Sequence, residues 1–290
     1  MTLASFNEYG LLKRVAVRTP DAAFVSDEKI VEEWQPLRFY SAPKLAEAVA
    51  EHSQFIKILS AAGANVVQLD TAEALTLDSI YSRDALLVSP DGLILCNMGR
   101  AGRSAEPAVN AQQLEQAGFS VAGHIEAPGT IEGGDVIWLD EKALAVGEGP
   151  RTNAEGILQF SRLLGPDVEV HVVPLPEPDH PDDVFHLMSM ISPLDGDLAL
   201  IYRPLMPDAF IMWLEARGIK FVEVPEAEFI PMGCNVLALG PRSVLMLDGL
   251  PQTKERLEQA GCHVQTYMGD EISRKGEGGP TCLTRPLVRE

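Results

Sequence analysis

Apolar and polar positions in this 290-residue chain form a unit that recurs five times along the sequence. In each unit a helical stretch ends at a glycine, and a short β-branched run follows at once. Glycine suits these helix ends because the residue after a helix often adopts a left-handed conformation. The helix-ending glycines are Gly63, Gly118, Gly165, Gly218 and Gly261, and strands are expected at 65–69, 120–122, 168–173, 220–224 and 263–267.

Two apolar runs joined by a turn precede the helices and predict a β-hairpin in each case. The paired runs are 85–88 with 93–96, 135–139 with 143–146, 189–192 with 198–202, and 235–239 with 243–247. The repeating unit is therefore strand, strand, helix, strand.

Five such units need neighbours to cover their apolar faces, so they could stack as an open solenoid or close into a ring. The helix-ending glycines are 55, 47, 53 and 43 residues apart, a period typical of both arrangements. Because the terminal units lack an obviously polar capping character, we expect a closed ring. A closed ring predicts a site on its axis, built from equivalent points of several units.

The composition indicates a globular protein, since 46% of the residues are apolar. The 42 Asp and Glu residues outnumber the 23 Lys and Arg residues, and the net charge of −19 disfavours a basic surface for nucleic acid or anionic lipid. This charge suits a small cationic substrate, although an acidic surface that only confers solubility is the simpler interpretation.

The first ten residues lack the basic and apolar regions of a signal peptide, and no stretch reaches the ~18 apolar residues needed to span a bilayer. We therefore expect a soluble, cytoplasmic protein. The four cysteines, at positions 96, 234, 262 and 282, are too few and too scattered for a disulfide framework. No C-x-x-C pair indicates a zinc or dithiol centre, so each cysteine has to be judged alone.

Chemically useful side chains stand at the edges of four repeats. They are Asp78 and Asp84 in LDSIYSRDALLV, Glu132 in IEGGDVIWLD, His186 in HPDDVFHLMSMI and Cys282 in KGEGGPTCLTRPL. Taken singly, each has an ordinary structural explanation: a buried cysteine that packs, a structural histidine, or acids and glycines that form turns. Their joint appearance at equivalent positions, with a glycine-rich approach to the cysteine, favours a catalytic site.

Four segments carry a resemblance to a known family. Glu-Gly-Gly-Asp at 132–135, Arg-Thr-Asn at 151–153, His-Leu at 186–187 and Gly-Gly-Pro-Thr-Cys at 278–282 resemble the motifs of the guanidino-modifying enzymes of the pentein superfamily, in their order and approximate spacing. The resemblance covers nearly the whole chain. It implies an α/β fold of the five-bladed, pseudo-symmetric α/β-propeller type, a closed ring of strand-strand-helix-strand repeats, with residues 1–290 as a single catalytic domain.

Within that superfamily the chain is most similar to the dimethylarginine dimethylaminohydrolases, and the arginine deiminases are the nearest alternative. The two acids six residues apart, Asp78 and Asp84, match the dimethylaminohydrolases, and Met188 replaces the aspartate of the His-x-Asp motif of deiminases. Arg83, in contrast, matches the Arg-Asp of deiminases. The substrate therefore stays open between a methylated arginine, cleaved to citrulline and an amine, and arginine, citrulline or the donor of an amidinotransferase.

The resemblance also implies residue roles. Cys282 is expected to be the nucleophile, His186 the acid and base, and Glu132 the group that orients His186. A guanidinium carbon is a poor electrophile, so the enzyme has to fix the cation and present a thiolate, which the cation itself stabilises. Attack by Cys282 would lead to a covalent thiouronium that water then hydrolyses.

Substrate-binding roles follow from the same resemblance. Asp78 and Asp84 are expected to fix the guanidinium, and Arg103 and Arg151 the α-carboxylate. No metal or organic cofactor is required. The expected partner is a small guanidino compound and not nucleic acid or a membrane, and a homo-oligomer stays possible.

Two other classes of protein remain possible. A metal-dependent hydrolase could use the dense cluster of His180, Asp182, Asp183 and His186. A non-catalytic ring could merely bind a cationic amino acid.

Overall fold

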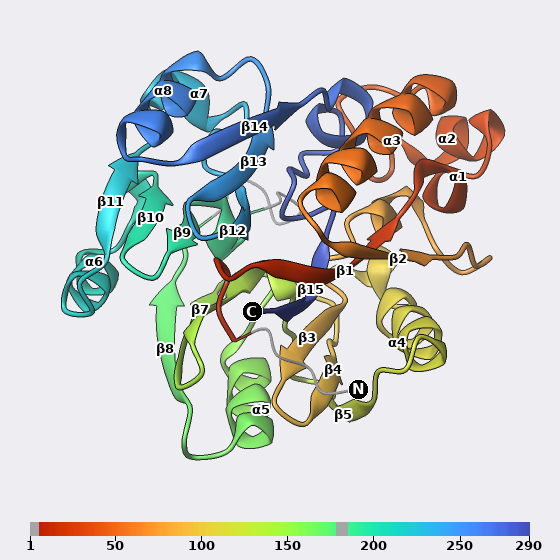
Figure 1. Ribbon diagram of the computed structural model, residues 1–290. Coiled ribbons are helices and arrows are strands. Elements are labelled where there is room, and N and C mark those ends of the chain that lie inside the picture. Colours follow the sequence, from red (N-terminus) through yellow and green to blue (C-terminus); the bar gives the residue numbers. More distant parts are fainter. Residues whose placement is uncertain (1–5, 178–184) are drawn as a thin grey trace.

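The computed structural model describes residues 6–177 and 185–290, and within them fifteen strands form five sheets of three strands each (Figure 1). The strands are β1 (Leu12–Arg18), β2 (Asn65–Leu69), β3 (Leu86–Ser89), β4 (Gly92–Leu95), β5 (Val121–His124), β6 (Val136–Asp140), β7 (Ala143–Glu148), β8 (Glu169–Pro174), β9 (Ile191–Asp195), β10 (Leu198–Ile201), β11 (Lys220–Glu223), β12 (Leu237–Gly240), β13 (Ser243–Leu247), β14 (His263–Tyr267) and β15 (Arg285–Arg289). The helices are α1 (Pro20–Ala23), α2 (Asp27–Glu33), α3 (Leu45–Ala61), α4 (Glu106–Gln116), α5 (Ala154–Leu164), α6 (Asp208–Glu215), α7 (Glu226–Phe229) and α8 (Pro251–Gln259).

All five sheets have the same topology, so the predicted unit is confirmed. In the third sheet, for example, the middle strand β7 runs antiparallel to β6 and parallel to β8, and helix α5 makes the crossover between the two parallel strands. The predicted strands 65–69, 243–247 and 263–267 coincide with β2, β13 and β14, and the other predicted strands differ from the observed ones by a few residues at their ends. The five sheets form the predicted five-bladed α/β-propeller.

The first sheet is assembled from both ends of the described chain. Strand β1 pairs with β15 on one side and with β2 on the other, and Figure 1 draws the red β1 beside the dark blue β15. Backbone hydrogen bonds between Leu11 and Glu290, 2.6 and 3.0 Å long, extend this pairing. The strand β15 was not predicted, since the sequence after the last unit was interpreted as a tail. Its pairing closes the ring.

The five helix-ending glycines have the predicted left-handed conformation, with φ between 79° and 92°. A Cβ atom added to any of them would meet nothing within 4 Å. Backbone conformation alone, and not close packing, therefore requires glycine at these positions.

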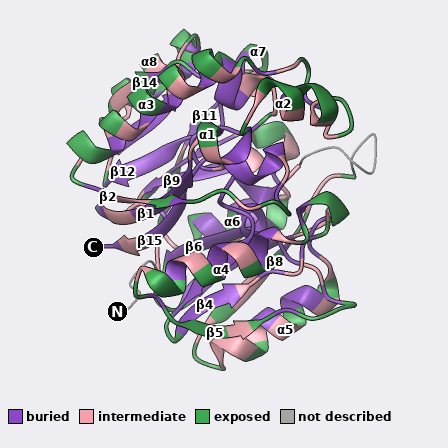
Figure 2. Ribbon diagram, turned by 90° about the vertical axis from the view of Figure 1, so that its right-hand side faces the viewer, coloured by how far each residue is buried: buried purple, intermediate pink, exposed green. Residues whose placement is uncertain are grey.

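Burial follows the alternation of strand and helix. Figure 2 shows that the strands are mainly buried, while the surrounding helices expose one side. Helix α5 illustrates the pattern: Ile157 and Phe160 are buried, and Asn153 begins the helix by accepting a hydrogen bond from the backbone of Gly156 at 2.8 Å. Arg151 lies two residues before Asn153 and is buried.

Cysteines 96, 234 and 262 are buried and Cys282 is partly exposed, and all four are free, as expected. Among the described residues, no helix is long and apolar enough to cross a membrane.

Candidate active site

In each sheet, one strand runs antiparallel to the middle strand, and we call these five strands the inner strands. Each of them is preceded by a segment with a polar side chain. Asp84 precedes β3, Glu132 precedes β6, His186 precedes β9, Asn235 precedes β12 and Cys282 precedes β15. Hydrogen bonds join the neighbouring segments to one another: Gly134 to Asp84, His186 to Glu132, and Asn235 to Cys282. The site predicted on the axis of the ring is therefore built from equivalent points of all five units.

His186 and Glu132 form a buried pair. Nε2 of His186 lies 2.8 Å from Oε2 of Glu132, which has no exposed surface. The other oxygen of Glu132 accepts hydrogen bonds from the backbone N–H groups of Gly99 and Arg100, at 3.0 and 3.2 Å. Glu132 thus fixes the orientation of the imidazole and leaves Nδ1 as the ring atom for proton transfer.

The charges around this pair favour an imidazolium. Burial alone would lower the pKa of His186, but the charges of Asp84, Asp135 and Glu132 outweigh it and raise that pKa to about 9. Burial alone would raise the pKa of Glu132, but its hydrogen bond to His186 and the charge of His186 lower it below the usual range. At neutral pH the pair is therefore an ion pair with a proton available on His186.

Cys282 is held by its neighbours in the chain and by Asn235. Nδ2 of Asn235 donates a hydrogen bond to Sγ of Cys282 at 3.3 Å, and Oδ1 of Asn235 accepts the backbone N–H and the hydroxyl of Thr281, at 3.0 and 2.8 Å. Burial and the charge of Asp84 raise the pKa of Cys282, and the bond from Asn235 partly offsets them. These surroundings favour a thiol, and a bound cation would favour the thiolate.

Arg83 ties the second unit to the segment of the cysteine. Its backbone N–H donates to the carbonyl of Cys282 at 3.2 Å, and its Nε donates to the carbonyl of Thr281 at 3.0 Å. The same guanidinium forms a buried ion pair with Glu8, in which Nη1 lies 3.1 Å from Oε2. Arg83 therefore holds the segment of Cys282 in place.

The four predicted substrate-binding residues come together in one hollow. We name it the charged hollow, and it is lined by Asp78, Asp84, Arg100, Arg103 and Arg151 together with His186 and Cys282. Oδ1 of Asp84 accepts the backbone N–H of Gly134 at 3.0 Å, and Oδ2 accepts Nη1 of Arg103 at 2.6 Å. The predicted proximity of these acids and arginines to Cys282 and His186 is thus observed, and their roles toward a substrate stay predictions.

The three arginines of the charged hollow differ in how they are held. Arg103 forms a two-point ion pair with Glu106 and also donates to Asp84 and to the carbonyl of Tyr81, so most of its N–H groups are already used. Nη1 of Arg151 lies 3.5 Å from Glu132. The side chain of Arg100 is 16% exposed against 5% for Arg103 and for Arg151, and Arg100 pairs with Asp78 at 2.9 Å. Arg100 is therefore the most accessible cation of the three.

The glycines of the Glu-Gly-Gly-Asp segment allow the groups of the site to approach one another. A Cβ atom on Gly134 would lie 2.7 Å from Nδ1 of His186 and 2.9 Å from Asp84, and one on Gly133 would lie 2.2 Å from the carbonyl of Arg83. These contacts are too short for any side chain. The two glycines therefore serve close packing around His186, beyond the tight turn that they also make.

Sequence reasoning missed three residues of the site. Asn235 stands at the fifth equivalent edge, so the repeat pattern that indicated the other four could have indicated it. Asp135 ends the Glu-Gly-Gly-Asp segment, and it accepts the backbone N–H of Leu187 at 2.9 Å and the hydroxyl of Thr152 at 2.6 Å, which ties three motifs together. Arg100 has no comparable signal in the sequence.

Of the four residues predicted as possible metal ligands, His180, Asp182 and Asp183 lie outside the described residues. Among the described residues, one ligand atom from each of Asp84, Glu132 and His186 lies within 4.8 Å of the others. The carboxylates of this cluster already accept N–H donors from Gly134, Arg103, Gly99 and His186. An ion bound there would have to displace several of these donors.

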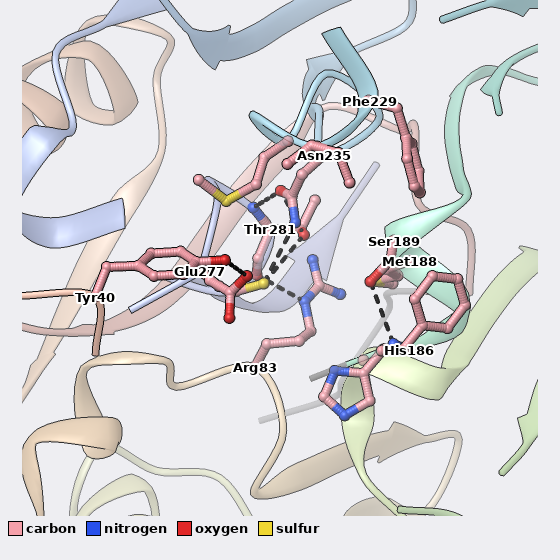
Figure 3. Close-up of a pocket in the computed structure, with 14 residues that line it drawn as sticks. Tyr40, Arg83, His186, Met188, Ser189, Phe229, Asn235, Glu277 and Thr281 are labelled. Carbon is pink, nitrogen blue, oxygen red and sulfur yellow. Dashed lines mark hydrogen bonds between the residues drawn. The ribbon is translucent and has the colours of Figure 1, made fainter. Parts of the chain in front are cut away.

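A second and larger hollow, of about 180 Å³, shares His186, Glu277 and Cys282 with the first (Figure 3). We name it the apolar hollow. Its apolar walls are Tyr40, Phe185, Met188, Phe229, Ile230 and Met232. Cys282 and His186 therefore stand where two hollows of different character meet.

Comparison with known proteins gives consistent results. The family model described as "N,N dimethylarginine dimethylhydrolase, eukaryotic" matches residues 35–289. The chain is 30% identical over 284 residues to the uncharacterized protein YkgA of Bacillus subtilis, covering 97% of this chain and 94% of that protein. It is 28% identical over 260 residues to the N(G),N(G)-dimethylarginine dimethylaminohydrolase of Streptomyces coelicolor, covering 84% of this chain and 93% of that enzyme.

Among solved structures, the dimethylarginine dimethylaminohydrolase of Pseudomonas aeruginosa in complex with citrulline superimposes with a TM-score of 0.77 at 25% identity. The superposition covers 97% of this chain and all of that chain (100%).

Proposed function

This chain belongs to the N,N-dimethylarginine dimethylhydrolase family, and on that premise we propose that it hydrolyses an Nω-substituted arginine to citrulline and an amine. Like its relatives, it is a hydrolase that acts on carbon–nitrogen bonds in linear amidines. The observation that carries the proposal is the charged hollow, in which Cys282 and His186 stand beside Asp78, Asp84 and Arg151. A nucleophile, a proton donor and anionic groups for a cation are thus within reach of one bound molecule.

Binding would prepare the nucleophile. The guanidinium would lie against Asp84, whose charge, with burial, raises the pKa of Cys282. Once the cation neutralises that charge, the Cys282 proton is lost more readily and the thiolate forms beside the guanidinium carbon. The enzyme would therefore generate its thiolate mainly when substrate is present.

The first chemical step would form a bond between Sγ of Cys282 and the guanidinium carbon. The tetrahedral adduct would collapse when the imidazolium of His186 gives its proton to the departing nitrogen and the C–N bond breaks. A neutral amine would leave, and a thiouronium would stay on the cysteine. Glu132 would stabilise the imidazolium before this transfer and orient the neutral imidazole after it.

The second step would consume one water molecule. Neutral His186 would take a proton from the water while the oxygen attacks the thiouronium carbon. The C–S bond would break as the hydroxyl proton of the adduct passes to the departing sulfur, so that citrulline leaves and the Cys282 thiol and the His186 imidazolium are restored. The water oxygen would thus appear in the ureido group of the product.

The test is the release of amine or ammonia and of a ureido product from arginine, Nω-methylarginine, asymmetric dimethylarginine, citrulline and agmatine. We expect Cys282→Ser to reduce kcat on the best substrate to a few per cent or less, because a hydroxyl supplies no comparable nucleophile at neutral pH. Cys262→Ser is the matched control and should keep full activity, since Cys262 lies away from both hollows. Substantial turnover by Cys282→Ser would remove Cys282 from the mechanism.

Arginine deiminase activity is the alternative favoured by the Arg83-Asp84 pair. Arg83 binds Glu8 and the carbonyl of Thr281, so its observed contacts are structural and do not exclude a methylated substrate. Met188, which places no carboxylate on the wall of the apolar hollow, supports the methylated substrate. A kcat/KM for arginine above that for both methylated arginines would favour the deiminase.

A further inference from the structure

The apolar hollow has polar groups in its walls, but most of them are already engaged. Glu277 accepts the hydroxyl of Tyr40 at 2.6 Å, and the hydroxyl of Ser189 accepts the backbone N–H of His186 at 3.2 Å. Asn235 is bound to Cys282 and to Thr281. The surface that remains for a ligand is therefore mainly apolar.

We propose that the apolar hollow binds the substituent on the departing nitrogen and selects arginines whose Nω-substituent is apolar and larger than methyl, such as n-butyl. This inference rests on the proposed function and deepens it. The charged hollow and the apolar hollow share His186, Glu277 and Cys282.

The orientation of the substrate in the two hollows follows from the charged groups that line one of them. The α-amino and α-carboxylate groups need ionic partners, and acids and arginines line the charged hollow. The guanidinium carbon has to lie at Sγ of Cys282, and the departing nitrogen has to lie near His186, which gives it a proton. A substituent on that nitrogen then points away from the charged hollow, across His186, and into the apolar hollow.

The size of the apolar hollow exceeds what a methylated arginine would fill. An apolar protein cavity of ~150 Å³ holds a benzene molecule, so a hollow of about 180 Å³ has room for a group of about four to six carbons. One or two methyl groups would leave the half-buried side chains of Phe229 and Met232 in contact with water. Each further buried methylene should raise kcat/KM roughly fourfold.

The decisive measurement is kcat/KM for a series of L-arginines that carry Nω-methyl, ethyl, n-propyl and n-butyl groups, followed by the release of citrulline. We expect a steady rise, with the n-butyl compound at least about tenfold better than the methyl compound. A flat or falling series, with turnover that still depends on Cys282, would overturn the inference and leave the proposed function intact. Absence of turnover with every arginine would overturn both.

Two variants test whether the rise in kcat/KM comes from binding of the substituent in the apolar hollow. Met188→Phe fills part of the apolar hollow and should flatten the series, with the largest loss for the n-butyl compound. Because Met188 is buried and its variant could fold poorly, Ile230→Asp provides an independent test: Ile230 is 81% exposed at the rim and tolerates a polar replacement. We expect Ile230→Asp to lower kcat/KM severalfold more for n-butylarginine than for methylarginine.

The matched control is Met212→Asp, which adds the same charge at a residue that is 67% exposed on helix α6 and lies outside the apolar hollow. It should leave the whole series unchanged. Equal effects of Ile230→Asp and Met212→Asp on the n-butyl compound would show that charge alone is responsible and would overturn the assignment of the hollow.

Discussion

At the scale of residues, the proton on His186 depends on the carboxylates that face it. Burial lowers the pKa of His186, whereas Asp84, Asp135 and Glu132 together raise it to about 9. In the proposed mechanism the imidazolium is the acid, so the activity should be lost as the pH rises through this pKa. A histidine with its ordinary pKa of ~6.5 would already be mostly neutral at pH 8.

We expect Glu132→Gln to lower the pKa of His186, because the amide removes one of these charges while its oxygen can still accept the N–H groups of Gly99 and Arg100. The alkaline limb of kcat should move to lower pH, and kcat at pH 8 should fall by roughly a hundredfold. Glu228→Gln, which alters a carboxylate buried against Thr253, is the control and should leave the limb in place. An unchanged limb in Glu132→Gln would mean that Glu132 does not tune the acid.

The sequence indicated which residues belong to the candidate site, but it did not indicate which of them contact one another. Cys282, His186 and Glu132 stand out because unusual motifs surround them, and such motifs can be recognised in the sequence alone. The contacts of Arg103 and Arg100 cannot be recognised in the same way, because they join residues on either side of the β3–β4 hairpin: Arg103 binds Asp84 and Arg100 binds Asp78. Which arginine meets a substrate carboxylate therefore could not be deduced from residue type.

At the scale of elements, the helix ends were the clearest signal in the sequence, and the structure explains why. Each helix-ending glycine has a positive φ and an empty space where a Cβ would stand. Strand ends were less predictable, since the inner strands are only four or five residues long and hydrogen bonding, not residue type, decides where they stop.

We expect Gly63→Ala, at the end of helix α3, to reduce the free energy of unfolding by about 1 kcal/mol, because alanine is strained in the left-handed conformation. Activity should not change, since the added methyl group would meet nothing within 4 Å. Urea unfolding measures the effect. Gly63→Asn, whose side chain tolerates this conformation, should lose less stability, and equal losses for Ala and Asn would argue against backbone strain as the cause.

At the scale of the whole molecule, the closed ring was predicted but its manner of closure was not. The segment 285–289 reads Arg-Pro-Leu-Val-Arg, with charged residues at both ends and a proline, and nothing in it predicts a buried strand. Its place in the first sheet is decided by distant partners, since Arg289 donates to the carbonyls of Gly10 and Ala238. A single catalytic domain, a cytoplasmic location and a homo-oligomer stay predictions.

Removal of residues 285–290 should abolish cooperative folding. The truncation takes away the inner strand of the first sheet, including the fully buried Leu287, and exposes the pairing edge of β1. Solubility and urea unfolding provide the measurement. Glu290→Ala, which keeps the backbone bonds to Leu11, is the control and should resemble the wild type, whereas wild-type stability of the truncated chain would mean that β15 is dispensable.

The pairing of β1 with β15 also sets an order of events during synthesis. More than 250 residues separate the two strands, and at 5–20 residues per second the ribosome needs roughly 13–50 seconds to travel between them. Once β2 has been made, the first blade has two of its three strands until translation reaches β15, and Cys282 is made only shortly before that strand. A nascent chain therefore exposes an unpaired strand edge until translation passes residue 289, and this edge is a natural binding site for chaperones. Cys282, the proposed nucleophile, and the last strand are made almost together, so a chain interrupted earlier would lack both the closed ring and the proposed catalytic cysteine.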